Sequence, residues 1–117
     1  MKKFLICEDD RDMIDFLKRY LPSKGYNFMI VEEGGKVLPA IKSDHIQFLL
    51  LDLNLPDMDG REVIQLLRAD PTARKIPIVL FTATARAEKI QAEFNTDGLL
   101  KKPFDLEELN AVIRKYC

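Results

Sequence analysis

Hydrophobic residues along the chain fall into two alternating patterns, short unbroken apolar runs and longer stretches in which apolar residues recur every three or four positions. Unbroken runs are typical of strands that are buried on both faces, because a strand with one face in water alternates apolar and polar residues. We expect five such strands, at residues 3–7, 27–31, 48–51, 76–81 and 99–100. The recurring stretches between them predict amphipathic helices.

Five helical stretches follow the strands in turn. The apolar positions that we expect them to bury are Met13, Ile14, Leu17, Tyr20 and Leu21; Val37, Leu38 and Ile41; Val63, Ile64 and Leu67; Ile90 and Phe94; and Leu106, Leu109, Val112, Ile113 and Tyr116. Pro22 and Gly25 should end the first helix, and Asp105 should cap the last one. The fourth helix, residues 85–94, has only two large apolar residues and should be the least firmly packed.

Strands that alternate with helices pair in parallel through right-handed crossovers. The sequence therefore predicts an α/β fold, a doubly wound sandwich in which helices cover both faces of the sheet. At 117 residues the chain has the commonest size of one domain, and no repeat, linker or low-complexity segment divides it. We expect a single domain over residues 1–117.

Polar residues stand where the strands end. They are Glu8 and Asp9 after the first strand, Asp52 after the third, Thr82 after the fourth and Lys102 after the fifth. In open parallel sheets the carboxyl ends of the strands share one edge, and ligands bind there. We therefore expect these five side chains to lie close together, since a chance placement of all five is improbable.

Composition excludes several classes of function. With 47% hydrophobic and 32% charged residues the chain has the composition of a soluble globular protein, neither disordered nor membrane-spanning. A net charge of −1 gives no basic surface for nucleic acid. Cys7 and Cys117 lack the spacing of metal ligands, and no signal sequence precedes Phe4, so we expect a reducing cytoplasm and a buried Cys7. The single histidine, His45, lies in a polar connection and is expected at the surface.

The expected site holds the groups needed to move a phosphoryl group onto a carboxylate. Neighbouring carboxylates repel one another unless a cation neutralises them, and Mg²⁺ suits a site of one to three carboxylates completed by water and carbonyl oxygens. Thr82 offers a hydroxyl donor and Lys102 a fixed positive charge, both suited to phosphoryl oxygens. Asp52 would then be the nucleophile.

Four motifs extend this interpretation: CEDD at residues 7–10, DLNLPDMDG at 52–60, FTA at 81–83 and KKPF at 101–104. With these motifs in this order, the chain resembles the receiver domain of the two-component response-regulator family over essentially its whole length. The resemblance implies a flavodoxin-like, five-stranded parallel sheet in the order 2-1-3-4-5. It also implies a phosphoacceptor switch that assists its own phosphorylation and dephosphorylation and is not an enzyme in the usual sense.

The resemblance further implies a role for each site residue. Asp52 would accept a phosphoryl group from the phosphohistidine of a sensor histidine kinase or phosphotransfer protein. Asp9 would bind Mg²⁺ directly and Glu8 through water, and Asp52 and the backbone carbonyl of Asn54 would complete the metal site.

Thr82 and Lys102 would bind the phosphoryl oxygens, and the Lys102–Pro103 peptide bond is expected to be cis because this turn aims the lysine inward. Binding of a downstream protein would be the output.

One departure from the family pattern concerns this output. Leu99 stands where the family usually has Tyr or Phe, and Asn95-Thr96 replaces a common Gly-Ala. Leucine has no ring to turn inward, so we expect Leu99 to stay buried in both states. The change on phosphorylation would then run through residues 82–94.

Three other classes of protein fit the sequence less well. A Mg²⁺-dependent phosphatase that uses an aspartyl-phosphate needs a second acid two residues after the nucleophile, where this chain has Asn54. A flavodoxin-like electron carrier needs a loop rich in Ser, Thr or Gly after the first strand, and the acids at 8–10 would repel its phosphate. An inactive receiver-like interaction module would not need all five site residues.

Overall fold

The computed structural model describes residues 2–117 and contains one five-stranded parallel sheet in the order β2-β1-β3-β4-β5. The strands are β1 Lys3–Cys7, β2 Phe28–Val31, β3 Ile46–Leu51, β4 Ile78–Thr82 and β5 Gly98–Lys101. The expected α/β fold and the expected strand order are therefore confirmed. Because every paired strand runs in the same direction, all the carboxyl ends lie at one edge of the sheet.

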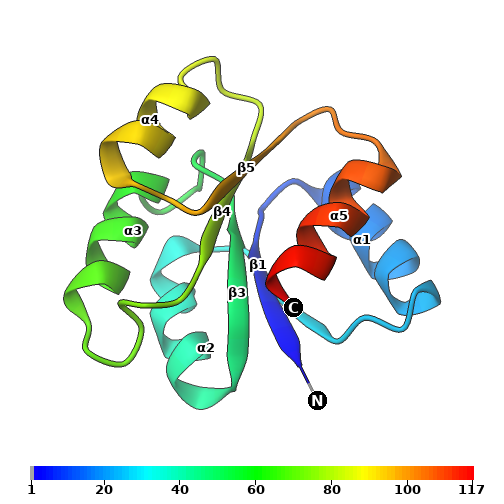
Figure 1. Cartoon of the computed structure of the whole chain (residues 1–117), viewed down its shortest axis with the longest axis horizontal. Coiled ribbons are helices and arrows are strands. Elements are labelled where there is room, and N and C mark those ends of the chain that lie inside the picture. The colour runs from blue at the N-terminus through cyan, green and yellow to red at the C-terminus, as the bar shows by residue number, and fades with distance from the viewer. Residues whose placement is uncertain (1) are drawn as a thin grey trace.

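Helices cover both faces of this sheet. They are α1 Arg11–Ser23, α2 Val37–Ser43 with the short 3₁₀-helix η1 Gly34–Lys36 before it, α3 Gly60–Ala69, α4 Ala87–Phe94 and α5 Leu106–Tyr116. Figure 1 shows α1 and α5 on one face and α2, α3 and α4 on the other. Among the described residues no helix combines the length and the apolar character that a membrane crossing requires.

The core has two apolar layers, one on each side of the sheet. Alternate residues of a strand point to opposite faces, so Leu49 and Leu51 pack toward α2 and α3 while Phe48 and Leu50 pack toward α1 and α5. This arrangement explains why the strands read as unbroken apolar runs. The α1 and α5 side is rich in aromatic rings, with Phe4 and Phe48 stacked at a centroid distance of 5.0 Å.

Most strands differ from their predicted ranges by one or two residues at an end, and three element boundaries have a clear physical cause. β4 begins at Ile78 because Pro77 has no N–H for the sheet and the Ile76 N–H instead donates to Ala73 O at 3.1 Å. α1 continues one residue past Pro22, and the chain leaves the helix at Gly25, whose φ is +74°. α4 begins only at Ala87, after a turn in which the Ala87 N–H donates to Thr84 O.

The start of α5 combines a confirmed prediction with a wrong one. Asp105 caps the helix in a reciprocal capping box with Glu108. Leu106, which was expected to be buried, is 44% exposed. Phe104, just before the helix, is partly buried against the core, and its ring packs against that of Phe81 at a centroid distance of 5.4 Å.

The predictions for Cys7 and His45, a buried thiol and a surface histidine, are confirmed. Cys7 is fully buried in β1 between β2 and β3, and His45 is exposed. Burial, and after it the negative charges of Asp57 and Asp52, raise the pKa of the Cys7 thiol to about 12. Cys117 is partly buried at the end of α5.

Candidate functional site

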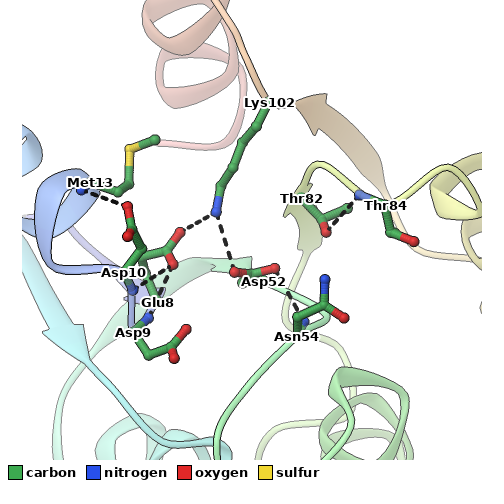
Figure 2. Close-up of polar contacts among 9 residues, drawn as sticks. All are labelled: Glu8, Asp9, Asp10, Met13, Asp52, Asn54, Thr82, Thr84 and Lys102. Carbon is green, nitrogen blue, oxygen red and sulfur yellow. Dashed lines mark hydrogen bonds and ion pairs between the residues drawn. The ribbon is translucent and has the colours of Figure 1, made fainter.

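The strand ends bring the expected side chains together at one edge of the sheet (Figure 2). Glu8, Asp9 and Asp52, called here the acidic cluster, each offer one carboxylate oxygen, and these three oxygens lie within 4.8 Å of one another. Glu8 is fully buried, Asp52 is 7% exposed and Asp9 is half-buried. A cluster this close and this enclosed favours a bound cation, because water cannot fully screen the repulsion.

Glu8 is fixed by hydrogen bonds on both carboxylate oxygens. Its Oε2 accepts the backbone N–H groups of Asp9 at 3.1 Å and Asp10 at 3.0 Å. Its Oε1 accepts a hydrogen bond from the Lys102 ammonium. Burial raises the pKa of the Glu8 carboxyl, and the hydrogen bond from Lys102 opposes that rise.

Asp10 has a different role from the two acids before it. Its Oδ2 accepts the backbone N–H of Met13 at 3.0 Å, which caps the N-terminus of α1. The third acid of the CEDD motif is therefore used to begin the helix. Asp9 contributes its carboxylate to the acidic cluster.

Asp52 is held from three sides. Its N–H donates to Cys7 O at 3.1 Å, which ties the end of β3 to the end of β1. Its Oδ1 accepts the Asn54 N–H at 3.2 Å, and its Oδ2 lies 3.2 Å from Lys102 Nζ. The carboxylate is therefore buried, oriented and paired with a positive charge.

The loop after Asp52 turns back in a tight hairpin. Asn54 and Asp59 form an antiparallel bridge, and the Gly60 N–H donates to Leu53 O at 2.9 Å. A Cβ on Gly60 would lie 2.7 Å from the Leu53 Cα, so only glycine permits this approach. The hairpin keeps Asn54, whose carbonyl was expected to bind the metal, beside Asp52.

A second support of this loop was missed by the sequence analysis. The Asp57 carboxylate accepts the backbone N–H groups of Gly34 at 2.8 Å and Gly35 at 2.9 Å. Hydrogen bonds from Gly35 and Gly34 lower the pKa of the Asp57 carboxyl. A Cβ on Gly34 would lie 2.6 Å from Met58 Cγ, so the two loops approach each other closely. The signal that could have revealed this contact was the Gly-Gly pair before a short helix, whose backbone N–H groups can donate to a carboxylate.

Lys102 enters the site from the loop after β5. Its N–H donates to Thr82 O at 2.9 Å, and the Lys102–Pro103 peptide bond is cis, as expected. Its ammonium bridges Glu8 and Asp52 and also lies 4.7 Å from the centroid of the Phe81 ring. No role for Phe81 was predicted from the sequence.

Thr82 is fully buried at the end of β4, and its Oγ1 accepts the Thr84 N–H at a long 3.4 Å. In the view of Figure 2, Asp52 lies between Thr82 and Glu8. The structure thus gathers every sequence-predicted site residue at one edge. It brings Lys102 into contact with both Glu8 and Asp52.

The chemistry of these donors suits a hard cation and an anionic group. Three carboxylates and a nearby carbonyl are oxygen ligands, which Mg²⁺ prefers over nitrogen or sulfur. A carboxylate that also faces an ammonium can act as a nucleophile toward a group whose negative oxygens the ammonium stabilises.

Comparison with known proteins agrees with this arrangement. Residues 4–114 match the family model described as "Response regulator receiver domain". The response regulator MprA of Mycobacterium avium is 36% identical over 114 residues, which are 96% of this chain and 49% of MprA. The transcriptional regulatory protein TctD of Salmonella typhimurium is 34% identical over 114 residues, 96% of this chain and 50% of TctD. The chain thus spans about half the length of the curated relatives it matches.

Solved structures share the fold over the whole chain. The response regulator protein TrrA from Thermotoga maritima, solved in complex with Mg²⁺ and BeF, is 26% identical, and the match covers 100% of both chains with a TM-score of 0.86. A putative response regulator from Chloroflexus aurantiacus is also 26% identical, with a TM-score of 0.88 over 98% of this chain and 96% of that one. Since the family model runs almost from end to end and the fold agrees with it, the chain belongs to the response regulator receiver domain family of two-component signalling.

Proposed function

We propose that this receiver domain is the phosphoacceptor switch of a two-component phosphorelay. Asp52 accepts a phosphoryl group from the phosphohistidine of a sensor histidine kinase or a phosphotransfer protein. The observation that carries this proposal is the Lys102 ammonium, which pairs with both Glu8 and Asp52 inside a cluster of three close carboxylates. A nucleophile, a cation site and a stabilising charge are the parts that phosphoryl transfer to a carboxylate requires.

In this proposal Asp9, Asp52 and the backbone carbonyl of Asn54 bind the metal directly, and Glu8 binds it through water. The donor set supports Mg²⁺, since its members are all oxygens and their carboxylates lie within 4.8 Å of one another. The TrrA relative, of the same fold, was solved in complex with Mg²⁺ and BeF, which gives the same choice of cation further support. When bound, Mg²⁺ supplies positive charge that neutralises the carboxylates and the phosphoryl oxygens.

In the proposed transfer, a carboxylate oxygen of Asp52 attacks the phosphorus atom. The new P–O bond forms as the P–N bond to the histidine ring breaks, and the imidazole leaves with the bonding electron pair and takes up a proton. The Lys102 ammonium and the Thr82 hydroxyl donate hydrogen bonds to the phosphoryl oxygens. Attack of water on the phosphorus atom then breaks the P–O bond to Asp52, releases inorganic phosphate and restores the carboxylate. Lys102 and Thr82 stabilise the phosphoryl oxygens in this step as well, so the domain assists its own phosphorylation and dephosphorylation.

Residues 82–94 carry the output in this proposal. Thr82 closes on the phosphoryl group and gives up its long hydrogen bond from Thr84. α4 begins at Ala87 after a short turn, is eight residues long, buries only Ala87 and Ile90, and has no side-chain cap at its N-terminus. A weakly held helix is the element that a small shift at the site can move, and its movement would regulate a downstream partner protein.

Intact-mass measurement tests the phosphorylation site. A small acyl phosphate plus Mg²⁺ should add one phosphoryl group to the wild-type chain, and none to Asp52→Asn. Asp15→Asn, which removes an exposed acid on α1 outside the acidic cluster, should be labelled like the wild type. Equal labelling of the Asp52→Asn and wild-type chains would contradict the assignment.

Amide hydrogen exchange tests the output. With a phosphoryl mimic bound, exchange should change across residues 83–94. Leu99, which packs partly buried against the core on the α2 to α4 side, should change little. Changes confined to the strand around Leu99, with residues 83–94 unaffected, would show the output proposal to be wrong.

A further inference from the structure

The Phe81 ring is a neutral contact of the Lys102 ammonium. Phe81 is fully buried in β4, directly before Thr82, and its ring centroid lies 4.7 Å from Lys102 Nζ. The ammonium also contacts Glu8 and Asp52, which are charged groups whose environment changes when a cation or a phosphoryl group binds. The attraction between an ammonium and the negative face of a ring does not depend on those two charges.

The Phe81 ring is itself held in place by other aromatic rings. Phe104 packs against it at a centroid distance of 5.4 Å, and the Phe16 ring of α1 meets Phe104 edge-on at 6.5 Å. Phe104 lies two residues after Lys102 in the same loop. The loop that carries Lys102 therefore also carries Phe104, whose ring packs against Phe81.

Lysine has a long, flexible side chain, and ordering it costs rotamer entropy. Glu8 and Asp52 attract the ammonium to two different points, so the acids alone do not set its position. A fixed ring beside the ammonium restricts the positions that it can take. Only the positions close to Asp52 serve phosphoryl transfer.

We propose that Phe81, supported by Phe104, is a positioning residue that holds the Lys102 ammonium at Asp52 through its ring face. This inference rests on the proposed function, because it assigns Phe81 a role in the same transfer. Phe81 touches neither the phosphoryl donor nor the metal ligands in this assignment and acts only through Lys102.

The first test compares two buried phenylalanines. Phe81→Leu removes the ring beside Lys102, whereas Phe48→Leu removes an equally buried ring that stacks on Phe4 in the same core layer. The measured quantity is the rate constant of phosphorylation by a small acyl phosphate at saturating Mg²⁺. We expect Phe81→Leu to be about five-fold slower than wild type, the effect of about 1 kcal/mol of cation–π attraction. Phe48→Leu should stay within about two-fold of wild type, on the same scale, and equal rates for the two variants would overturn the inference.

A double-mutant cycle separates positioning from a general effect on the core. If Phe81 acts through Lys102, then Phe81→Leu should have no further effect on the rate in a Lys102→Ala background. An equal slowing in both backgrounds would mean that the ring acts on something other than the lysine, and would overturn the proposal.

A measurement on the unmutated chain does not depend on the folding of any variant. Protons above a ring face resonate upfield, so the Lys102 ε-methylene signals should lie upfield of those of the other lysines. Signals that coincide with those of the exposed lysines would refute the placement. If the wild-type chain takes up no phosphoryl group, the proposed function fails, and the upfield shift still decides whether Phe81 positions the ammonium.

Discussion

Replacing Asp9 by asparagine should change the stability of the domain in opposite directions without and with Mg²⁺. Asp9 is the half-buried member of the acidic cluster, and its carboxylate lies within 4.8 Å of those of Glu8 and Asp52. Without a cation the substitution removes like-charge repulsion. With a cation it removes a proposed ligand.

The magnitudes follow from the distances. At an effective dielectric constant of about 20, two unit charges 4.8 Å apart repel by about 3 kcal/mol. The Lys102 ammonium and the solvent around Asp9 offset most of this, so we expect Asp9→Asn to be more stable than wild type by about 1 kcal/mol in the absence of Mg²⁺.

Binding of Mg²⁺ reverses the order. At a Mg²⁺ concentration of about 100 Kd, the wild type gains about 2.7 kcal/mol. Loss of a direct carboxylate ligand should raise Kd by about 100-fold, the upper range for lost partners in the outer shell of a metal site. The variant then gains only about 0.4 kcal/mol at the same concentration and becomes less stable than wild type by about 1 kcal/mol.

Urea unfolding followed by far-UV circular dichroism, in a chelator and in Mg²⁺, measures these free energies. Asp15→Asn is the matched control, since it makes the same chemical change at an exposed position of α1 and should differ from wild type by less than about 0.5 kcal/mol in both buffers. If Mg²⁺ stabilises Asp9→Asn as much as the wild type, Asp9 is not a metal ligand and the reasoning is refuted.

Three further predictions concern single side chains. The buried Thr96 hydroxyl has no hydrogen-bond partner among the described residues, so Thr96→Val should raise the free energy of unfolding by about 1 kcal/mol in urea titrations. Thr72→Val, at an exposed position, should not raise it. A loss of stability in Thr96→Val would contradict this prediction. Gly60→Ala should cost about 2 kcal/mol of stability, because its Cβ would meet the Leu53 backbone, and an unchanged urea midpoint would show that the loop yields freely. Lys102→Ala should bind Mg²⁺ by calorimetry no more weakly than wild type and yet be phosphorylated more slowly; weaker Mg²⁺ binding would show that the lysine supports the metal site.

Periodicity and strand ends were sufficient to predict the fold and to bring the site residues together. All the side chains of an unbroken apolar run such as Phe48 to Leu51 can be buried only if an apolar layer covers each face of the sheet. The strands of such a sheet are parallel, so the residues at their carboxyl ends lie along one edge. The family motifs supplied the strand order and the cis peptide bond. Both are observed.

Other features depend on contacts between distant segments, which local patterns do not encode. Periodicity predicted a buried Leu106, but Leu106 is exposed, and Phe104, which lies outside the periodic stretch, packs against Phe81 in the core. The hydrogen bonds from Gly34 and Gly35 to Asp57 join two loops more than 20 residues apart. The ring of Phe81 lies beside Lys102 only because β4 and β5 are neighbours, and an apolar run does not show which of its residues faces the site.

The burial of Cys7 makes this thiol an internal reporter of opening of the central sheet. Alkylating reagents react with thiolates that they can reach, and Cys7 is fully buried with its pKa raised to about 12. Its modification therefore requires β1 to separate from its neighbours β2 and β3. Cys117, which is only partly buried, should react first and provide an internal reference in the same sample. A ligand that binds only the folded chain should slow the labelling of Cys7 by the factor by which it increases the folding equilibrium constant. The rate of Cys7 labelling, followed by mass spectrometry, therefore measures binding without an added probe.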